Sequence, residues 1–257
     1  MQAFRILLFS LVLSSTALGA RIGLSPLRLE HEDHTQASFR INVFTPAATS
    51  LPQRMSKSLK DLDIRQIPDV GSYSDLENNF KYIRDLRFIE DTRHANTLRR
   101  LTWLYPDDGC YARAEMASRA LEDIHFVTPK KIFVFGNLRA RTNNTSYGYV
   151  TWWYHVAVTY RVGNTAYVYD PAIEPKAPIT LEAWNAAVGG TATRVTYAIC
   201  DHNTFDPNMD CVHPNGLPLD EVLREQTSFL PDEWERLVDL NRDPVKELGD
   251  FPPWLQK

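Results

Sequence analysis

Hydrophobic and polar positions alternate most regularly between residues 150 and 160. A period of two residues is typical of a β-strand, because successive side chains point to opposite faces of a sheet. On this pattern one face of the strand carries Trp152, Tyr154, Val156, Val158 and Tyr160. The other face carries Trp153, His155, Ala157 and Thr159. A polar turn at 162–165 and a return run at 166–170 come next, so the pattern predicts an antiparallel hairpin.

The length of the hairpin turn decides which side chains meet across the two strands. If Gly163-Asn164 is a two-residue loop, position 157 faces 170, and Asp170 lies diagonal to His155 on the same face. A loop on Val162-Gly163 would instead place His155 directly opposite Asp170. Either even-length loop brings the imidazole and the carboxylate within reach, whereas an odd-length loop with a bulge would separate them.

A period near 3.6 residues, typical of helices, recurs in other segments. Ser74 and Glu77 have capping-box spacing, which predicts a helix from Ser74 to about Thr92 whose core-facing stripe is Leu76, Phe80, Ile83 and Phe88. Helix-forming residues fill Cys110 to Asp123. Further predicted elements are a strand at 131–139, a polar loop at 142–148, a short helix at 181–188, a strand at 194–200 and a helix that Pro231 opens and that carries Trp234, Leu237 and Leu240.

Together these elements predict an α+β fold. Helices and antiparallel strands succeed one another along 257 residues, of which 44% are hydrophobic, which is enough for one domain with a sizeable core. We expect the helix that begins at Cys110 to pack on an antiparallel sheet that carries His155 and Asp170.

The first 19 residues are typical of a secretory signal peptide. Arg5 precedes an apolar run at 6–13, and the small residues Ala17 and Gly19 suit cleavage before Ala20. The run is too short for a bilayer, which needs roughly 20 apolar residues. Residues 20–62 differ in character from the rest of the chain, with three prolines around one plausible strand at 38–44. We expect an N-terminal extension or short pro-segment there and a catalytic domain at 63–257.

The charge of the chain argues against nucleic acid and anionic membranes as partners. The formal net charge is −4, and no basic patch indicates binding to nucleic acid or to an anionic membrane. With the signal peptide, this composition predicts a secreted or periplasmic monomer that has no stable membrane association.

Three cysteines in an exported chain leave one without a partner. The natural pair is Cys200 with Cys211, which leaves Cys110 as a free thiol. A free thiol can simply be a small buried residue, but in an exported protein an unpaired thiol is a liability unless it has a function. The acidic residues between Cys200 and Cys211 lack the glycine and terminal glutamate of an EF-hand, so we expect a polar loop closed by a disulfide and no metal site.

Cys110 stands where a thiolate forms most readily. Gly109 allows the turn into the helix, and the unpartnered amides and positive dipole at a helix start favour an anion. With His155 to hold the thiolate and protonate the leaving group, and Asp170 to orient the imidazole, Cys110 could attack a carbonyl carbon. The N–H of Cys110 would face the oxyanion. This set predicts acyl transfer that requires no metal or organic cofactor.

The motifs around these three residues resemble those of the bacterial protein glutaminases. The matching segments are Ile67-Pro68-Asp69-Val70, Asp108-Gly109-Cys110-Tyr111-Ala112-Arg113-Ala114, Phe133-Val134-Phe135-Gly136-Asn137-Leu138-Arg139-Ala140, Trp153-Tyr154-His155-Val156-Ala157 and Asp170-Pro171. They extend from about Asp63 to near the C-terminus, in the order of the family. The order Cys, His, Asp is also that of the transglutaminase and papain group.

The resemblance implies that the protein hydrolyses glutamine side-chain amides in proteins or peptides to glutamate and ammonia. Its triad maps onto Cys110, His155 and Asp170. Trp153, Asn137 and Tyr154 lie near the motifs and could line a channel for glutamine. Of these, Trp153 is the better candidate, because the alternation puts it on the face of His155, whereas Trp152 and Tyr154 are better explained as core.

One departure and several alternatives accompany this interpretation. Familiar members carry a long inhibitory pro-segment, whereas only about 42 residues, 21–62, stand before the predicted domain. The strand at 38–44 would either pack as a permanent edge strand or plug the site. A transglutaminase, a cysteine peptidase and a non-catalytic binding or effector module are the alternative functions.

Overall fold

The structure, a computed structural model, describes residues 51–94 and 96–256. The predicted signal peptide and the predicted strand at 38–44 lie outside these residues. The described chain is α+β, as expected, and its centre is an antiparallel five-stranded sheet of order β6-β5-β4-β3-β7. Its strands are β3 (Lys130–Arg141), β4 (Tyr149–Val162), β5 (Thr165–Tyr169), β6 (Ile179–Thr180) and β7 (Thr196–Cys200). A separate two-stranded sheet consists of β1 (Ile89–Glu90) and β2 (Leu98–Arg99).

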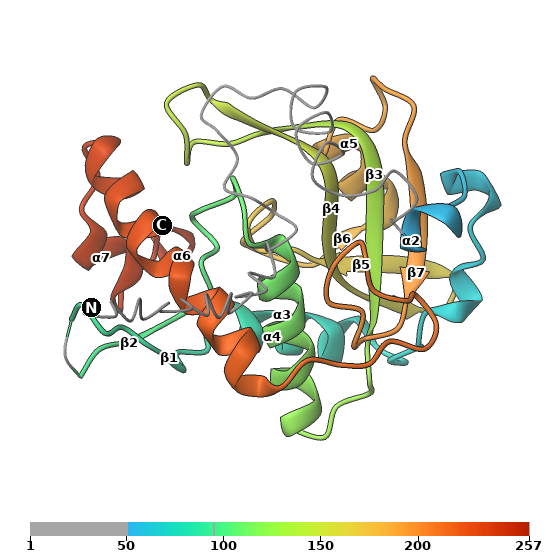
Figure 1. Cartoon of the computed structure of the whole chain (residues 1–257), viewed down its shortest axis with the longest axis horizontal. Helices are drawn as coiled ribbons and strands as arrows, with labels where there is room; N and C mark the ends of the chain where they lie inside the picture. The colour runs from blue at the N-terminus through green and yellow to red at the C-terminus, as the bar shows by residue number, and fades with distance from the viewer. Residues whose placement is uncertain (1–50, 95, 257) are drawn as a thin grey trace, which may run out of the picture.

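Helices of very different length surround the sheet. The α-helices are α2 (Leu51–Arg54), α3 (Tyr73–Asp85), α4 (Cys110–Asp123), α5 (Leu181–Ala187), α6 (Leu219–Asp239) and α7 (Pro244–Leu248). Short 3-10 helices are η1 (Leu59–Asp61), η2 (Ile64–Gln66) and η3 (Pro253–Leu255). In Figure 1, α4 and α6 lie to the left of the sheet, and α2 lies beside β7 at its opposite edge.

The hydrophobic residues of β4 belong alternately to two clusters, one on each face of the sheet. Val156, Val158 and Tyr160 belong to the first cluster, which also holds the buried faces of α3, α4 and α6. Ala157 belongs to the second cluster, which includes Trp184 of α5. The two-residue period therefore predicted the sides of β4 correctly from residue 154 onward.

A β-bulge reverses this alternation at the start of β4. Phe135 pairs with Tyr154, but the next pair is Leu138 with Trp152, so two residues of β3 oppose the single residue Trp153. The extra residue moves Trp152 into the second cluster and lets Trp153 pack against the first. The predicted faces of these two tryptophans were therefore wrong, because a strict alternation assumes an unbroken ladder.

The β4–β5 hairpin has the turn in which Gly163 and Asn164 are the two loop residues. Val162 pairs with Thr165, so Gly163 and Asn164 form a two-residue loop. Gly163 has φ of 57°, a left-handed conformation that glycine adopts at little cost. This register places position 157 level with 170, immediately beyond the last pair of the ladder, and so Asp170 lies diagonal to His155 as predicted.

Two helices, α3 and α6, have bounds that differ from the predictions. The side chain of Ser72, not Ser74, caps α3, because its Oγ accepts the N–H of Asp75 at 3.1 Å and donates to the Asp75 carboxylate at 2.9 Å. Helix α3 ends at Asp85, so Phe88 lies beyond it. Pro231 lies inside α6 rather than at its start. The apolar contacts of α6 on both sides of the proline outweigh the backbone hydrogen bond that it removes.

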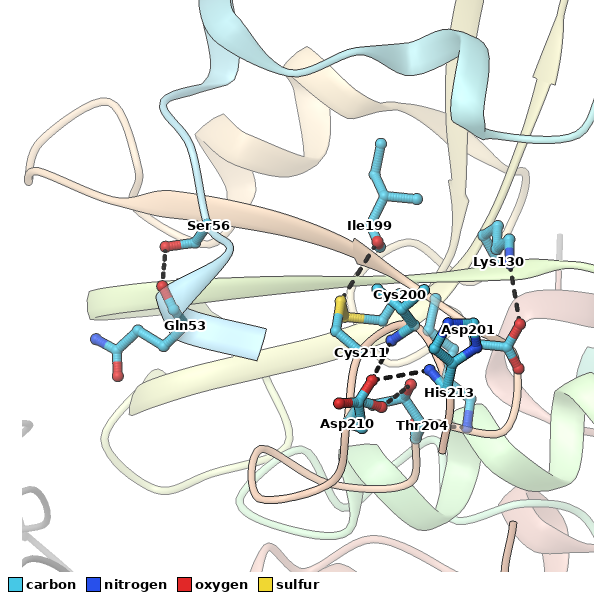
Figure 2. The surroundings of a disulfide bond; sticks show 12 residues. Gln53, Ser56, Lys130, Ile199, Cys200, Asp201, Thr204, Asp210, Cys211 and His213 are labelled. Carbon is cyan, nitrogen blue, oxygen red and sulfur yellow. Dashed lines mark hydrogen bonds and ion pairs between the residues drawn. A yellow bond between two sulfur atoms is a disulfide. The ribbon is translucent and has the colours of Figure 1, made fainter. Parts of the chain in front are cut away.

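The predicted disulfide between Cys200 and Cys211 is present. Figure 2 shows Asp210 in the loop that it closes, with its carboxylate accepting the N–H groups of Val212 and His213 at 2.7 and 2.8 Å. Asp201 likewise accepts the N–H of Asn203 at 3.1 Å. These carboxylates stabilise turns, and no group of three or more metal-binding side chains occurs among the described residues. The predicted closure of this loop by a disulfide is confirmed.

The end of the predicted N-terminal extension is part of the sheet edge. Lys57 exchanges two backbone hydrogen bonds with Tyr197 of β7, at 2.8 and 2.7 Å. Residues 57–62 therefore pack with the predicted catalytic domain, and a boundary at residue 62 would divide a segment that already contacts the sheet.

Candidate active site

The thiol of Cys110 lies at the first residue of α4, and Gly109 makes this possible. Gly109 precedes the helix with φ of 77°. A Cβ atom there would lie 2.9 Å from the ring of Phe229, closer than atoms of this kind approach. Backbone conformation and space therefore both require glycine. Cys110 itself is only 8% exposed and is the free cysteine of the described chain.

A buried arginine holds the loop that leads to Cys110. Arg113 lies one turn into α4, and its Nη1 atom donates to the carbonyl oxygens of Thr102, Tyr105 and Asp108 at 3.3, 3.0 and 2.7 Å. Because a buried guanidinium must find acceptors, these bonds fix the loop against the helix. Arg113 was not identified as a site residue from the sequence. A charged residue between two alanines of a helix expected to be buried could have indicated this role.

His155 and Asp170 form a buried hydrogen-bonded pair. Nε2 of His155 lies 2.7 Å from Oδ2 of Asp170, and the two residues are 1% and 4% exposed. The indole N–H of Trp184 donates to the same carboxylate oxygen at 2.8 Å. Nδ1 of His155 is buried and has no hydrogen-bond partner in the described chain. The interaction of Cys110 with the imidazole contributes to the raised pKa of His155.

Trp152 connects the imidazole to the loop before Cys110. Its ring stacks on that of His155, with centroids 4.6 Å apart and planes inclined by 13°. Its indole N–H donates to the carbonyl oxygens of Pro106 and Asp107 at 3.0 and 3.2 Å. Trp152 therefore positions the histidine relative to the cysteine. Strict alternation placed Trp152 on the face of the strand opposite to His155, because it does not anticipate the bulge at Gly136-Asn137.

The three predicted substrate-binding residues are not gathered around the imidazole. Trp153 packs on Tyr154 and Phe135, at centroid distances of 4.6 and 6.2 Å. Asn137 is exposed at the bulge, where its carbonyl oxygen accepts a hydrogen bond from Thr193 at 3.0 Å. Tyr154 is buried in the cluster that contains Cys110, and its hydroxyl has no hydrogen-bond partner in the described chain. Their contact with substrate stays a prediction.

The electrostatic environment favours a charged imidazole beside the thiol. Burial alone would lower the pKa of His155, but the charge and hydrogen bond of Asp170, with smaller effects from Cys110, raise that pKa from 6.5 to about 9. Burial alone would raise the pKa of Asp170, and the charge and hydrogen bond of His155 lower it below 3.8 instead. At neutral pH the pair is therefore imidazolium and carboxylate.

The His155–Asp170 pair should make the stability of the fold depend on pH. Because the pKa of His155 is about 9 in the folded chain against 6.5 unfolded, its contribution is complete below 6.5 and is lost as the pH rises through 9. Because the pKa of Asp170 is lowered from 3.8, its contribution is present above 3.8 and is lost at lower pH.

We expect urea unfolding to show a decrease in stability between pH 6 and 9.5, on the order of 3 kcal/mol for a shift of this size. His155→Gln is the control, since it has no proton to lose over this range. An equally large decrease in that variant would contradict the assignment.

Comparison with known proteins identifies one similar family. Residues 76–188, somewhat less than half of the chain, match the model of a family described as glutaminase. That range contains Cys110, His155 and Asp170, together with Trp152 and Trp184. No curated protein matches the chain.

Three solved structures are similar to this chain. A crystal structure of pro-protein-glutaminase is 27% identical, with TM-score 0.48, over 63% of this chain and 58% of that chain. The A47Q2 mutant of pro-protein-glutaminase is 30% identical, with TM-score 0.42, over 54% and 49%. The NMR structure of protein-glutaminase from Chryseobacterium proteolyticum is 26% identical, with TM-score 0.44, over 73% and 92%. The chain thus spans about half the length of the two pro-protein-glutaminase chains.

Within the described part of this chain, no helix is both long and apolar enough to cross a membrane. What the site offers is a thiol, an imidazolium and a carboxylate in one buried group, the arrangement needed for nucleophilic attack on a carbonyl carbon.

Proposed function

We propose that this protein hydrolyses the side-chain amide of glutamine residues in proteins or peptides, releasing ammonia and leaving glutamate. The observation that carries the proposal is the buried His155–Asp170 hydrogen bond of 2.7 Å next to a free thiol at a helix start. The match of residues 76–188 to the glutaminase family supports the choice of amide. In this proposal Cys110 is the nucleophile, His155 the acid and base, and Asp170 the residue that orients His155.

The first half of the reaction forms a thioester. The Cys110 thiolate attacks the carboxamide carbon, and the electron pair of the C=O bond moves to its oxygen. The backbone N–H of Cys110 lies in the first turn of α4, where amides have no intrahelical partner, and it can donate to that oxyanion. His155 gives its proton to the amide nitrogen, the C–N bond breaks, and ammonia leaves.

The second half restores the enzyme. The neutral imidazole of His155 accepts a proton from a water molecule as the water oxygen attacks the thioester carbon. The C–S bond breaks, glutamate forms, and the protonated imidazole again faces a thiolate. Asp170 remains ionised throughout, because its role is to hold Nε2 and stabilise the positive ring. Each step uses side chains, backbone and water of this site.

The proposal is tested by four measurements on one glutamine-rich protein. We expect ammonia release, a mass increase of about 1 Da per deamidated glutamine, and neither incorporation of a primary amine nor new peptide termini. Amine incorporation would identify a transglutaminase, and new termini would identify a peptidase. No reaction in any of the four measurements would favour a binding module.

We also propose that the protein acts outside the cytoplasm, in the periplasm or the medium. The disulfide between Cys200 and Cys211 supports an oxidising compartment. N-terminal sequencing of exported protein tests this and the pro-segment together. A fully active mature chain that starts near residue 20 would exclude an inhibitory pro-segment, and retention in the cytoplasm would contradict export.

A further inference from the structure

A cavity of about 460 Å³ opens beside the turn that follows the proposed catalytic residue Asp170. One of its walls is the turn after Asp170, since Pro171, Ala172 and Ile173 all line it. The carbonyl oxygen of Asp170 accepts the N–H groups of Ile173 and Glu174 at 3.0 and 2.9 Å, which fixes this turn. The wall is therefore rigidly attached to the carboxylate that orients His155.

Two other segments also line the cavity. One is the loop that leads to Cys110, which contributes Leu104, and the other is the tip of the β3–β4 hairpin, which contributes Asn144. Arg236 of α6 joins the two segments, because its Nη1 atom donates to the Asp107 carboxylate at 2.6 Å and to the Asn144 carbonyl oxygen at 2.9 Å. A peptide chain advances about 3.3 Å per residue when extended. We therefore expect residues a few positions from a glutamine bound at Cys110 to reach this cavity.

The charged side chains that line the cavity are all cationic: Arg141, Lys176 and Arg242. Arg242 pairs with Glu247 and donates to the Asn144 side chain at 2.6 Å. Arg141 and Lys176 are exposed, and their side chains make no ion pair or hydrogen bond within the described part of the chain. Because the whole chain has a net charge of −4, this positive charge is a local feature.

We propose that the cavity is a subsite for an acidic side chain, aspartate or glutamate, that lies near the target glutamine. The inference rests on the proposed glutaminase function and specifies its preferred substrates as segments in which a carboxylate lies a few residues from glutamine. Arg141 and Lys176 supply the attraction, because two cations without an intramolecular partner bind a carboxylate without first breaking another ion pair.

This preference has a consequence for segments with several glutamines. Hydrolysis converts a neutral glutamine into glutamate, which carries the charge that the subsite prefers. Each deamidation would therefore create a favourable neighbour for the next glutamine, and the rate of ammonia release from such a segment would rise as the reaction proceeds.

The test compares two peptides that are acetylated and amidated at their ends, each with one central glutamine. One carries glutamates within four residues of that glutamine, and the other carries serines at the same positions. At low salt we expect kcat/KM for ammonia release to be about three- to tenfold higher for the acidic peptide, with the ratio falling as ionic strength rises.

The variant Arg141→Gln/Lys176→Gln should bring this ratio close to one. The matched control, Lys60→Gln/Arg194→Gln, removes the same charge from exposed positions outside the cavity lining and should leave the ratio unchanged. Because both peptides are measured on the same preparation, partial loss of folded protein cancels from the ratio.

The outcomes separate the subsite from the proposed function. Absence of ammonia from both peptides would overturn the proposed function. Ammonia release at equal kcat/KM, or a ratio that survives Arg141→Gln/Lys176→Gln, would leave that function standing and overturn the subsite. A preference seen only with peptides that have a free C-terminal carboxylate would assign the cavity to a chain end and overturn the side-chain assignment.

Discussion

Replacement of Cys110 with alanine is expected to lower kcat for ammonia release by at least about 10⁴-fold, because no other group at the site can form the thioester. Cys110 lies in a closely packed cluster, but alanine is smaller and helix α4 accepts it, so the fold should persist. Initial rates of ammonia release from a glutamine-rich protein measure the effect, and circular dichroism checks the fold.

Alkylation of the native protein provides a control for this result. Because Cys200 and Cys211 are joined, iodoacetamide should label Cys110 without labelling the other two cysteines. We expect activity to be lost in proportion to labelling and labelling to be absent in Cys110→Ala. A Cys110→Ala variant with undiminished activity would exclude Cys110 as the nucleophile.

The second large effect is expected at Asp170, where two substitutions separate charge from hydrogen bonding. In Asp170→Ala the indole N–H of Trp184 and the N–H of His155 lose their acceptor in a buried site, and the imidazolium loses its counter-charge. We expect kcat to fall by about 10³-fold or more and the folded state to be destabilised by about 2–4 kcal/mol.

Asp170→Asn should have a milder and more specific effect. The asparagine carbonyl oxygen can accept both hydrogen bonds, so the orientation of His155 is kept while the negative charge is lost. Because that charge is the main cause of the raised pKa of His155, the decrease in kcat/KM at high pH should move from near pH 9 to lower pH. A pH profile of kcat/KM measures the shift. An unshifted profile would show that Asp170 does not control the charge of His155.

Much of the site could be predicted from local pattern. The free thiol at the start of a helix follows from Gly109-Cys110 and the helix-forming residues after it, and the structure has α4 at Cys110–Asp123. The pairing of His155 with Asp170 follows from alternation and a two-residue turn, because a hairpin links positions only about 15 residues apart and its register depends on local geometry.

Other parts of the site depend on contacts between distant segments. Trp152 reaches the carbonyl oxygen of Pro106 across 46 residues, and Arg236 reaches Asp107 across 129 residues. The start of α6 at Leu219 was missed because a proline inside a helix costs stability that only tertiary packing offsets. No local pattern reports such packing.

The sequence by itself determined the fold class, the hairpin with His155 and Asp170, the disulfide and the residues that could carry out the chemistry, because each of these follows from local periodicity or from counting of cysteines. The tertiary structure alone decided that Trp152, and not Trp153, stacks on His155, because one bulge at Gly136-Asn137 reverses the facing of the strand next to it. It also decided that Arg141 and Lys176 line one cavity, since the charges of a surface combine only when folding brings their loops together.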